Sequence, residues 1–201
     1  SVIQNDVFTE CYNLTNARRK VAEDMKPLYF EKLLSIFDKD EFWTYSGDTY
    51  KNYINMALKE SGSIYSYDDF KKSYLKFNGK IPYFTKVVDL IKHLQQIKKC
   101  YMGILSNISE FDVELLKRYI DIDSLDFVFL SFKLGIQKPN NKVYDIVENV
   151  SKICPENILF IDDRKGNIEV AKQHGWNTCC ATGNEFEKIK NDCYKFLKIN
   201  D

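Results

Sequence analysis

Two adjacent acidic residues follow a short apolar run in the stretch ILFIDDRKGN. Asp162 and Asp163 come directly after the apolar run 158–161, which is typical of a buried strand. Neighbouring carboxylates in such a place repel each other and lose hydration, so they require a cation or several hydrogen-bond donors. Proteins commonly hold Mg²⁺ through one or two carboxylates together with phosphate oxygens. The pair therefore indicates a site for Mg²⁺ and a phosphate group.

A hydroxyl and an ammonium group follow two other apolar runs. Ser106 and Asn107 come after the run 101–105, and Lys138 lies in the stretch GIQKP, which follows the run 127–130. A serine and a lysine can hold the phosphate oxygens that a metal ion leaves uncovered. Simpler interpretations remain open at this point: Ser106 could cap the following helix, and Lys138 could be a solvated loop lysine.

The elements that would position these groups alternate in type after Pro82. Parallel strands joined by helices place ligand-binding residues at the carboxyl ends of the strands, so the polar groups above are expected at one edge of a sheet. The pattern predicts an α/β fold, a Rossmann-like parallel sheet with helices on both faces. The expected strands are 1–5, 101–105, 127–130, 158–161 and 178–181, and the expected helices are 87–97, 111–119, 143–150, 167–174 and 184–197.

Residues before Ile81 show helical spacing only. Apolar faces at 28–37 and 50–58, and an N-cap at Ser66 followed by acidic residues, predict a small all-helical unit. We expect this unit to span residues 14–81, and the α/β core to comprise residues 1–13 and 82–201. Most aromatic residues of the unit are expected in its core, and some could stack on a ligand; they are Phe42, Trp43, Tyr45, Tyr50, Tyr53, Tyr65, Tyr67 and Tyr74.

Composition excludes some classes of protein and favours others. The 201 residues carry 29 Lys+Arg against 29 Asp+Glu, and a nucleic-acid partner would normally require a basic excess. No run of membrane-spanning length or signal-peptide pattern is visible. The six cysteines and the two histidines, His93 and His174, lack zinc spacing, so we expect reduced thiols, packing or surface histidines and a cytoplasmic protein. The composition leaves open whether the protein is a monomer or a homodimer.

The stretches GILSN, GIQKP and FIDDRKGNIEVAKQHGW, in this order and spacing, resemble motifs II, III and IV of the haloacid dehalogenase (HAD) superfamily. The acidic stretch is especially similar to the branch that contains sugar-phosphate phosphatases and the phosphatase domain of soluble epoxide hydrolases. The helical unit lies where this superfamily carries its small C1 cap. The resemblance thus implies an HAD core with an all-helical C1 cap, which acts on a small phosphorylated substrate with Mg²⁺ as cofactor.

What the resemblance implies for single residues is a two-step phosphoryl transfer through a phosphoaspartate. Asp163 would bind the metal directly and Asp162 would support the metal site. Ser106 and Asn107 would hold phosphoryl oxygens, and Lys138 would neutralise charge on the nucleophile and the phosphoryl group. Asn167 would orient the acidic loop.

Motif I of the superfamily, DxDxT after an apolar strand, is degenerate in this chain, which reads SVIQNDVFTECYN. In the alignment that we favour, Asp6 is the nucleophile and a metal ligand, and Phe8 supplies a backbone carbonyl to the metal but replaces the usual general acid. In a second alignment Asn5 takes the place of the nucleophile. An amide cannot replace the carboxylate, so the protein would be catalytically inactive. In a third, the true motif lies upstream of Ser1.

Two functions therefore remain to be compared. The first is a Mg²⁺-dependent phosphatase of small phosphorylated metabolites, which motifs II to IV favour. Without the general acid that Phe8 replaces, such an enzyme would prefer good leaving groups, as in acyl, anomeric sugar or aryl phosphates. The second is a catalytically silent HAD-fold binding protein, which the degraded motif I favours. Dehalogenation itself is the weaker hypothesis, because Asp162 and Asp163 point to Mg²⁺ and phosphate.

Overall fold

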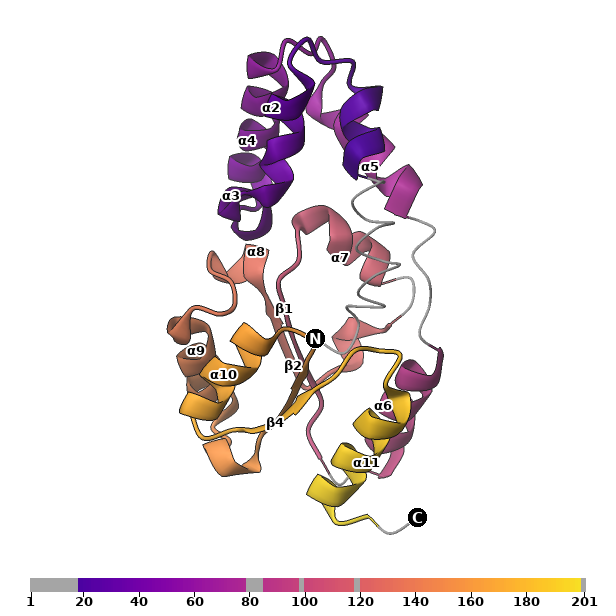
Figure 1. The fold of residues 1–201 in the computed structure, drawn as a ribbon, viewed down its shortest axis with the longest axis vertical. Helices are drawn as coiled ribbons and strands as arrows, with labels where there is room; N and C mark the ends of the chain where they lie inside the picture. Colours follow the sequence, from indigo (N-terminus) through magenta and orange to yellow (C-terminus); the bar gives the residue numbers. More distant parts are fainter. Residues whose placement is uncertain (1–17, 79–84, 98–99, 118–119, 200–201) are drawn as a thin grey trace.

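The structure, a computed structural model, describes residues 18–78, 85–97, 100–117 and 120–199. These residues form two stacked parts (Figure 1). We call residues 18–78 the helical unit, and the described residues from 85 onward the sheet unit. The strand expected at residues 1–5 lies outside the described residues, as do Asn5, Asp6, Phe8 and Cys11.

The helical unit begins with a helix over residues 18–24. It then contains α2 (Phe30–Leu34), the 3-10 helix η1 (Ser35–Asp38), α3 (Asp40–Thr44), α4 (Gly47–Glu60) and α5 (Tyr67–Asn78). The apolar face expected on α4 is confirmed, since Tyr50, Ile54 and Leu58 are buried. The cap expected at Ser66 is formed with Asp69, since Ser66 Oγ donates to the Asp69 carboxylate at 2.6 Å.

The expectation for Leu28 is wrong. Its side chain is 80% exposed, because α2 begins only at Phe30 and Leu28 therefore lies outside the helical register. The expectation that most aromatic residues form the core is confirmed. Phe42, Tyr50 and Tyr74 are fully buried, and four further residues pack against them while partly buried, namely Trp43, Tyr53, Tyr65 and Tyr67. Of the eight aromatic residues, Tyr45 stands apart as an exposed side chain.

The sheet unit has the expected alternation of strands and helices. The described strands are β1 (Gly103–Ser106), β2 (Phe127–Leu130), β3 (Leu159–Asp162) and β4 (Asn177–Cys180). The ends predicted for these four strands are within two residues of the observed ones. The strands pair in parallel, β1 with β2 and β3 with β4, with Ser106 opposite Leu130 and Asp162 opposite Cys180. The helices are α6 (Thr85–Ile97), α7 (Glu110–Leu116), α8 (Ser131–Leu134), α9 (Asn141–Ser151), α10 (Lys165–Gln173) and α11 (Phe186–Leu197), with 3-10 turns η2 (Ile122–Ser124) and η3 (Pro155–Asn157).

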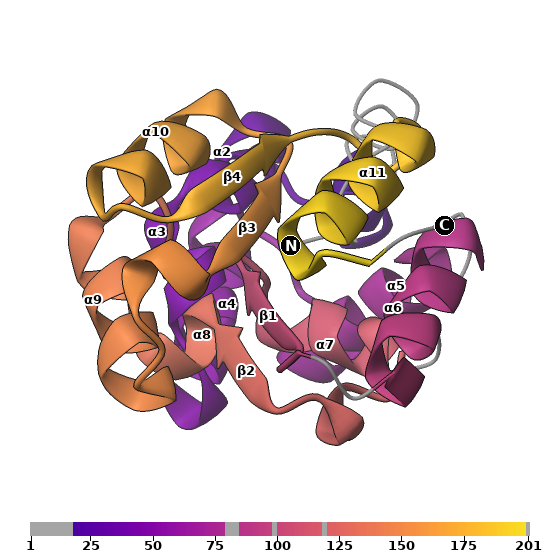
Figure 2. The same cartoon turned by 90° about the horizontal axis from the view of Figure 1, so that it is seen from below.

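Helices cover both faces of the strand layer, as predicted. Figure 2 shows α9 and α10 on one side of the strands, and α6 and α11 on the other. Successive strand residues point to opposite faces: Cys179 packs with the cluster of α6 and α11, whereas Cys180 packs against the cluster of α9 and α10. The α/β fold class is therefore confirmed.

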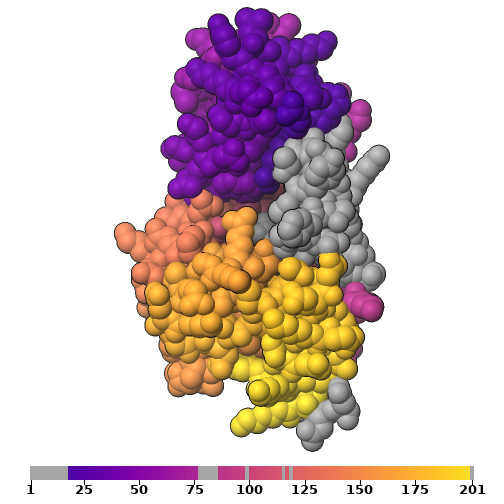
Figure 3. Space-filling view, in the orientation of Figure 1, coloured from indigo at the N-terminus to yellow at the C-terminus, as the bar shows by residue number. Residues whose placement is uncertain are grey.

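The cysteines that the structure describes are all free thiols, which agrees with the expectation of reduced cysteines. None of the described helices is long and apolar enough to cross a membrane. The space-filling view shows the helical unit resting directly on the sheet unit on the side of α8 (Figure 3).

Candidate active site at the strand ends

The polar residues singled out in the sequence gather where β1 and β3 end. Ser106 is the last residue of β1 and Asp162 the last of β3, and both are buried. Lys138, which lies between α8 and α9, bridges the two strand ends. The structure thus brings together the hydroxyl-bearing strand, the lysine and the acidic loop.

Lys138 is the centre of this arrangement and is only 4% exposed. Its Nζ lies 2.6 Å from Asp162 Oδ2 and donates to the carbonyl of Leu105 at 2.8 Å. The ammonium group also lies 5.2 Å from the centre of the Phe160 ring, within the range of a cation–π contact. The interpretation of Lys138 as a solvated loop lysine is therefore excluded.

Asn107 fixes the backbone of Lys138. Its side-chain oxygen accepts from the Lys138 amide at 2.8 Å, and its side-chain nitrogen donates to the Lys138 carbonyl at 2.8 Å. The residue after β1 thus sets the position of the residue that reaches β3. Phosphate binding by Asn107 stays a prediction. The sequence did not predict the contact of its side chain with the Lys138 backbone.

Both carboxylate oxygens of Asp162 are engaged. Oδ2 binds Lys138, and Oδ1 accepts from the Asn167 side chain and from the backbone amide of Arg164, each at 2.9 Å. Burial acts to raise the pKa of Asp162, but the charge and hydrogen bond of Lys138 outweigh it, so the pKa lies below its ordinary value. Asp162 is therefore a stable carboxylate that ties the acidic loop to Lys138.

Asn167 is held in place by contacts within the sheet unit. It lies in the first turn of α10, is 4% exposed, and its carbonyl accepts from the Tyr144 hydroxyl at 3.0 Å. Its amide nitrogen binds Asp162 Oδ1 as described. The geometry fits the expectation that Asn167 orients the acidic loop, although its effect on any reaction stays a prediction.

Ser106 does not cap the helix that follows it. That helix, α7, is capped by Ser109, whose hydroxyl donates to Asp112 at 2.7 Å and accepts from the Asp112 amide at 3.3 Å. The two groups form a capping pair at the start of α7. The structure thus removes the simpler interpretation of Ser106, which is the buried last residue of β1 and follows Leu105, whose carbonyl binds Lys138.

The donor set at this edge fits a hard divalent cation. Asp162 shares both oxygens with protein donors, and direct metal binding by Asp163, the next residue, stays a prediction. Asp163 is half-buried and lies just past the end of β3. The remaining expected ligands, Asp6 and the carbonyl of Phe8, lie outside the described residues, so the complete ligand set stays a prediction.

A second group of potential ligands lies elsewhere. His174 stacks on Tyr144 with ring centres 5.3 Å apart, and its Nδ1 lies 3.0 Å from Glu148 Oε1. Asp145 lies close enough to complete a cluster that could hold a metal ion. Glu148 Oε1 also accepts from the Trp176 indole at 2.8 Å. Because His174 stacks on Tyr144 and contacts Glu148, we interpret it as a packing residue, as expected from the sequence. The sequence did not predict these partners.

The helical unit is tied to the sheet unit close to the site. Gln137, next to Lys138, donates to Asp40 at 2.6 Å, and Ser131 Oγ donates to the Trp43 carbonyl at 2.7 Å. These contacts join residues 88 or more positions apart. In the sequence, Gln137 stands out only as part of the stretch GIQKP, and no pattern predicts a role for Ser131. Further ties link Gly47 to Glu110, Tyr74 to Asp112 and Lys71 to Glu114.

Comparisons with curated proteins give partial matches. A D-ribitol-5-phosphate phosphatase of Bacteroides thetaiotaomicron is 36% identical over 56 residues, which are 28% of this chain and 27% of the relative. An (S)-2-haloacid dehalogenase of Pseudomonas sp. strain YL is 27% identical over 109 residues, which are 53% of this chain and 47% of the relative. The aligned stretches therefore span less than half of either relative.

Solved structures share the fold over most of the chain. A HAD family enzyme from Bacteroides thetaiotaomicron, solved as a magnesium complex, superposes with a TM-score of 0.63 at 22% identity, covering 82% of this chain and 85% of the other. A HAD-like family hydrolase from Porphyromonas gingivalis gives 0.63 at 23% identity, covering 79% and 78%. The family profile of haloacid dehalogenase-like hydrolases matches residues 13–181. Since that match covers most of the 201 residues of this chain, the chain belongs to the haloacid dehalogenase-like hydrolases.

Proposed function

We propose that this protein is a Mg²⁺-dependent phosphatase of small phosphorylated metabolites that acts through a phosphoaspartate. The observation that carries the proposal is the buried ion pair of Lys138 and Asp162, 2.6 Å apart, between Ser106 on β1 and Asp163 after β3. A cation and a hydroxyl at the carboxyl ends of parallel strands form a receptor for a phosphoryl group.

Two relatives support the proposal without deciding it. One curated relative is named a D-ribitol-5-phosphate phosphatase. Structures of a HAD family enzyme from Bacteroides thetaiotaomicron, which share the fold, were solved in complex with magnesium and inorganic phosphate. Both points agree with the donor set of Asp162, Asp163 and Lys138, which suits a metal ion and a phosphate rather than a halogenated acid.

In the proposed mechanism the Asp6 carboxylate attacks phosphorus, and the bond between phosphorus and the leaving oxygen breaks. Water then attacks the phosphoaspartate, which releases inorganic phosphate and restores Asp6. Ser106 donates a hydrogen bond to a phosphoryl oxygen, and Lys138 offsets charge on Asp6 and the phosphoryl group. Bound Mg²⁺, held by Asp6, the Phe8 carbonyl and Asp163, would supply charge neutralisation at the phosphoryl oxygens. Asp162 and Asn167 hold Lys138 and the acidic loop in place.

The substitution of the general acid by Phe8 narrows the proposed substrates. A leaving oxygen that receives no proton from a side chain departs readily only when its conjugate acid is strong. Acyl, anomeric sugar and aryl phosphates meet this condition, whereas alkyl phosphates do so poorly. We expect acetyl phosphate and p-nitrophenyl phosphate to be hydrolysed faster than glycerol 3-phosphate, and comparable rates on all three would contradict this part of the proposal.

Phosphate release from acetyl phosphate and p-nitrophenyl phosphate, with and without Mg²⁺, tests the function and its nucleophile. The full-length natural chain is compared with Asp6→Asn, and with Asp89→Asn, an exposed position on α6, as the matched control. We expect release only with Mg²⁺, and its loss in Asp6→Asn alone. Release that survives in Asp6→Asn would move the nucleophile elsewhere. No release from a folded chain that binds Mg²⁺ would favour the silent binding protein.

The binding partner, the role of the helical unit, the location and the oligomeric state are proposed on the same basis. A small phosphorylated substrate is the expected partner, and the balanced charge gives no reason to add a nucleic acid. We propose a cap that spans residues 14–81, as expected from the sequence, and that includes the helical unit. A cytoplasmic location and a monomeric or homodimeric state remain predictions from the sequence.

A further inference from the structure

Three potential metal ligands from two helices meet outside the candidate active site. Asp145 and Glu148 lie about one turn apart on α9, and His174 directly follows the last residue of α10. His174 Nδ1 lies 3.0 Å from Glu148 Oε1 and 3.9 Å from Asp145 Oδ1. Ligand atoms of the three side chains all lie within 4.8 Å of one another. We call these three residues the His174 cluster, and Figure 2 shows the two helices that carry it on the same side of the strands.

The spacing of these atoms is that of ligands around a single divalent ion. Zn²⁺ binds imidazole nitrogen and carboxylate oxygen atoms at about 2.0–2.2 Å. Two such ligands are then about 3.0 Å apart at a right angle and about 3.4 Å apart in a tetrahedron. The separations of 3.0 and 3.9 Å from His174 Nδ1 lie close to these values. Because the Asp145 side chain is exposed, it can adjust to complete the geometry.

The charge of the cluster also calls for a cation. Among the ion pairs between residues that the structure describes, Asp145 and Glu148 pair with His174 and with no lysine or arginine. Whenever the imidazole is neutral, it offers a lone pair but no charge to offset the two carboxylates. His174 also follows the C-terminal end of α10, where the helix dipole favours positive charge. A metal ion bound there would neutralise this excess of negative charge.

Neighbouring side chains hold two of the three ligands in place. The Trp176 indole donates to Glu148 Oε1 at 2.8 Å. The His174 ring stacks on Tyr144 through its face, whereas Nδ1 at the ring edge lies against Glu148. Contacts of this kind orient metal ligands in proteins. The packing of His174 therefore leaves its edge for a ligand, and the exposed side of the cluster at Asp145 leaves room for water.

The His174 cluster is separate from the proposed Mg²⁺ site. Asp163 lies two positions before the start of α10, and His174 follows its end. The nine residues of α10 span about 13 Å between them. The ligand types differ as well, since Mg²⁺ prefers oxygen ligands alone whereas an imidazole suits Zn²⁺ and similar ions.

We propose that Asp145, Glu148 and His174 bind one Zn²⁺ ion, or a divalent transition-metal ion of similar chemistry, with water as a further ligand. Because the ligands come from two helices, the bound ion joins the C-terminal end of α10 to α9. Metal binding to the folded chain then stabilises it against unfolding. The site goes beyond the proposed phosphatase function and does not depend on it.

Zn²⁺ titration of the full-length natural chain, first freed of metal and then kept in excess Mg²⁺ to fill the proposed catalytic site, tests the cluster directly. Calorimetry measures the affinity and the number of ions bound per chain. Co²⁺ in place of Zn²⁺ reports the type of ligand, because thiolate ligands add a charge-transfer absorption that nitrogen and oxygen ligands lack. His174→Ala and Asp145→Asn are the test variants, and His93→Ala, at an exposed histidine on α6, is the matched control.

The natural chain and His93→Ala are expected to bind one Zn²⁺ ion per chain, and saturating Zn²⁺ should raise the thermal unfolding temperature of both. His174→Ala should weaken binding by at least about 100-fold and Asp145→Asn by at least about 10-fold, each with a matching loss of the stabilisation. The Co²⁺ form should show no thiolate absorption. Asp145→Asn changes an exposed side chain, so it tests the site even if His174→Ala does not fold.

Absence of saturable Zn²⁺ binding in the natural chain, or unchanged binding in Asp145→Asn and His174→Ala, would overturn the site. An equal loss in His93→Ala would show that the ion does not single out the cluster, and a thiolate absorption would assign it to the cysteines; either result would also overturn the inference. Phosphate release is not part of these measurements, so failure of the proposed phosphatase function leaves their outcome unchanged.

Discussion

At the scale of single residues, the site is organised around a buried charge pair. Lys138 and Asp162 are both nearly inaccessible, with side chains 2% and 0% exposed. Such a pair is weak evidence for stability as a whole, because desolvation offsets the attraction. Removal of one partner is different, since it leaves the other charge buried and uncompensated.

Lys138→Met is therefore expected to destabilise the protein by about 3–5 kcal/mol. The double variant Lys138→Met/Asp162→Asn should recover part of this loss, because no uncompensated charge remains. Urea unfolding measures both values, and Lys142→Met, an exposed lysine on α9, is the control. A loss below about 1 kcal/mol in Lys138→Met would contradict the buried pair.

Asp162 also sets an expectation for acid stability. Its pKa in the folded protein is below the ordinary value of 3.8, so the unfolded chain binds its proton first as pH falls. The stabilisation is therefore full above about pH 4–5 and is lost as pH falls through the folded pKa. We expect unfolding free energy to fall less steeply below pH 4 in Asp162→Asn than in the natural chain. Parallel curves in urea unfolding from pH 6 to pH 3 would contradict this.

At the scale of elements, two serines three positions apart perform different tasks. Ser106 ends β1, whereas Ser109 caps α7 through Asp112. The sequence predicts a cap and a phosphate ligand in this stretch but assigns neither with certainty, because both interpretations ask for a hydroxyl after a strand. Only the observed start of α7 at Glu110 separates them.

This separation gives a paired prediction. Ser109→Ala should lower unfolding free energy by about 1 kcal/mol through loss of the helix cap, and leave phosphate release nearly unchanged. Ser106→Ala should lower phosphate release by about 100-fold. Thermal unfolding and phosphate release on both variants check the pair. The reverse pattern would return Ser106 to the role of a helix cap.

Most elements of the sheet unit follow from sequence, because alternating apolar runs and helical spacing are local signals. The acidic pair also marks the site locally, since its position after an apolar run is readable from the chain. The burial of Lys138 does not follow, because it depends on Asn107 and Asp162, which are 31 and 24 positions away. The burial expected for Leu28 was wrong because the helical pattern in the sequence begins before the first residue of α2, Phe30.

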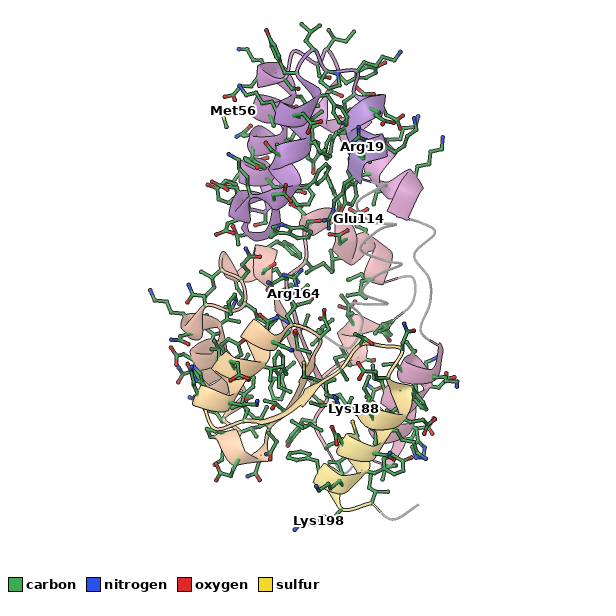
Figure 4. All side chains as sticks on the ribbon, in the orientation of Figure 1. Arg19, Met56, Glu114, Arg164, Lys188 and Lys198 are labelled. Atoms are coloured by element: carbon green, nitrogen blue, oxygen red, sulfur yellow. The ribbon has the colours of Figure 1, made fainter. Side chains whose placement is uncertain are left out.

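At the scale of the whole molecule, the two units meet through a buried ring and several polar contacts. Phe111 of α7 is fully buried and packs into the aromatic core of the helical unit, with its ring centre 5.1 Å from that of Tyr50 and 5.4 Å from that of Tyr74. Among the polar contacts, Tyr74 donates to Asp112, and the Tyr74 side chain is fully buried. The pair Lys71 and Glu114 is partly exposed, and such pairs contribute little. Figure 4 shows Glu114 on α7 facing the helical unit. These ties join distant positions, so no single-sequence pattern predicts them.

Tyr74→Phe is expected to destabilise the protein by about 1–3 kcal/mol, because the Asp112 carboxylate loses a buried donor. Lys71→Ala should change the free energy by less than about 1 kcal/mol. Hydrogen exchange should show faster opening of α5 and α7 in Tyr74→Phe than in Lys71→Ala. Equal protection in the two variants would mean that the Tyr74 contact does not hold the units together.

The central claim is that Lys138, Asp163 and Mg²⁺ form one phosphate-processing site. The most direct measurement is phosphate release from acetyl phosphate across a Mg²⁺ titration, with the full-length natural chain, Lys138→Ala, Asp163→Asn and the control Lys142→Ala. The account predicts Mg²⁺-dependent release in the natural chain and in Lys142→Ala, a loss of at least about 100-fold in Lys138→Ala, and a higher Mg²⁺ requirement in Asp163→Asn. Metal-independent release, or full activity in Lys138→Ala, would contradict it.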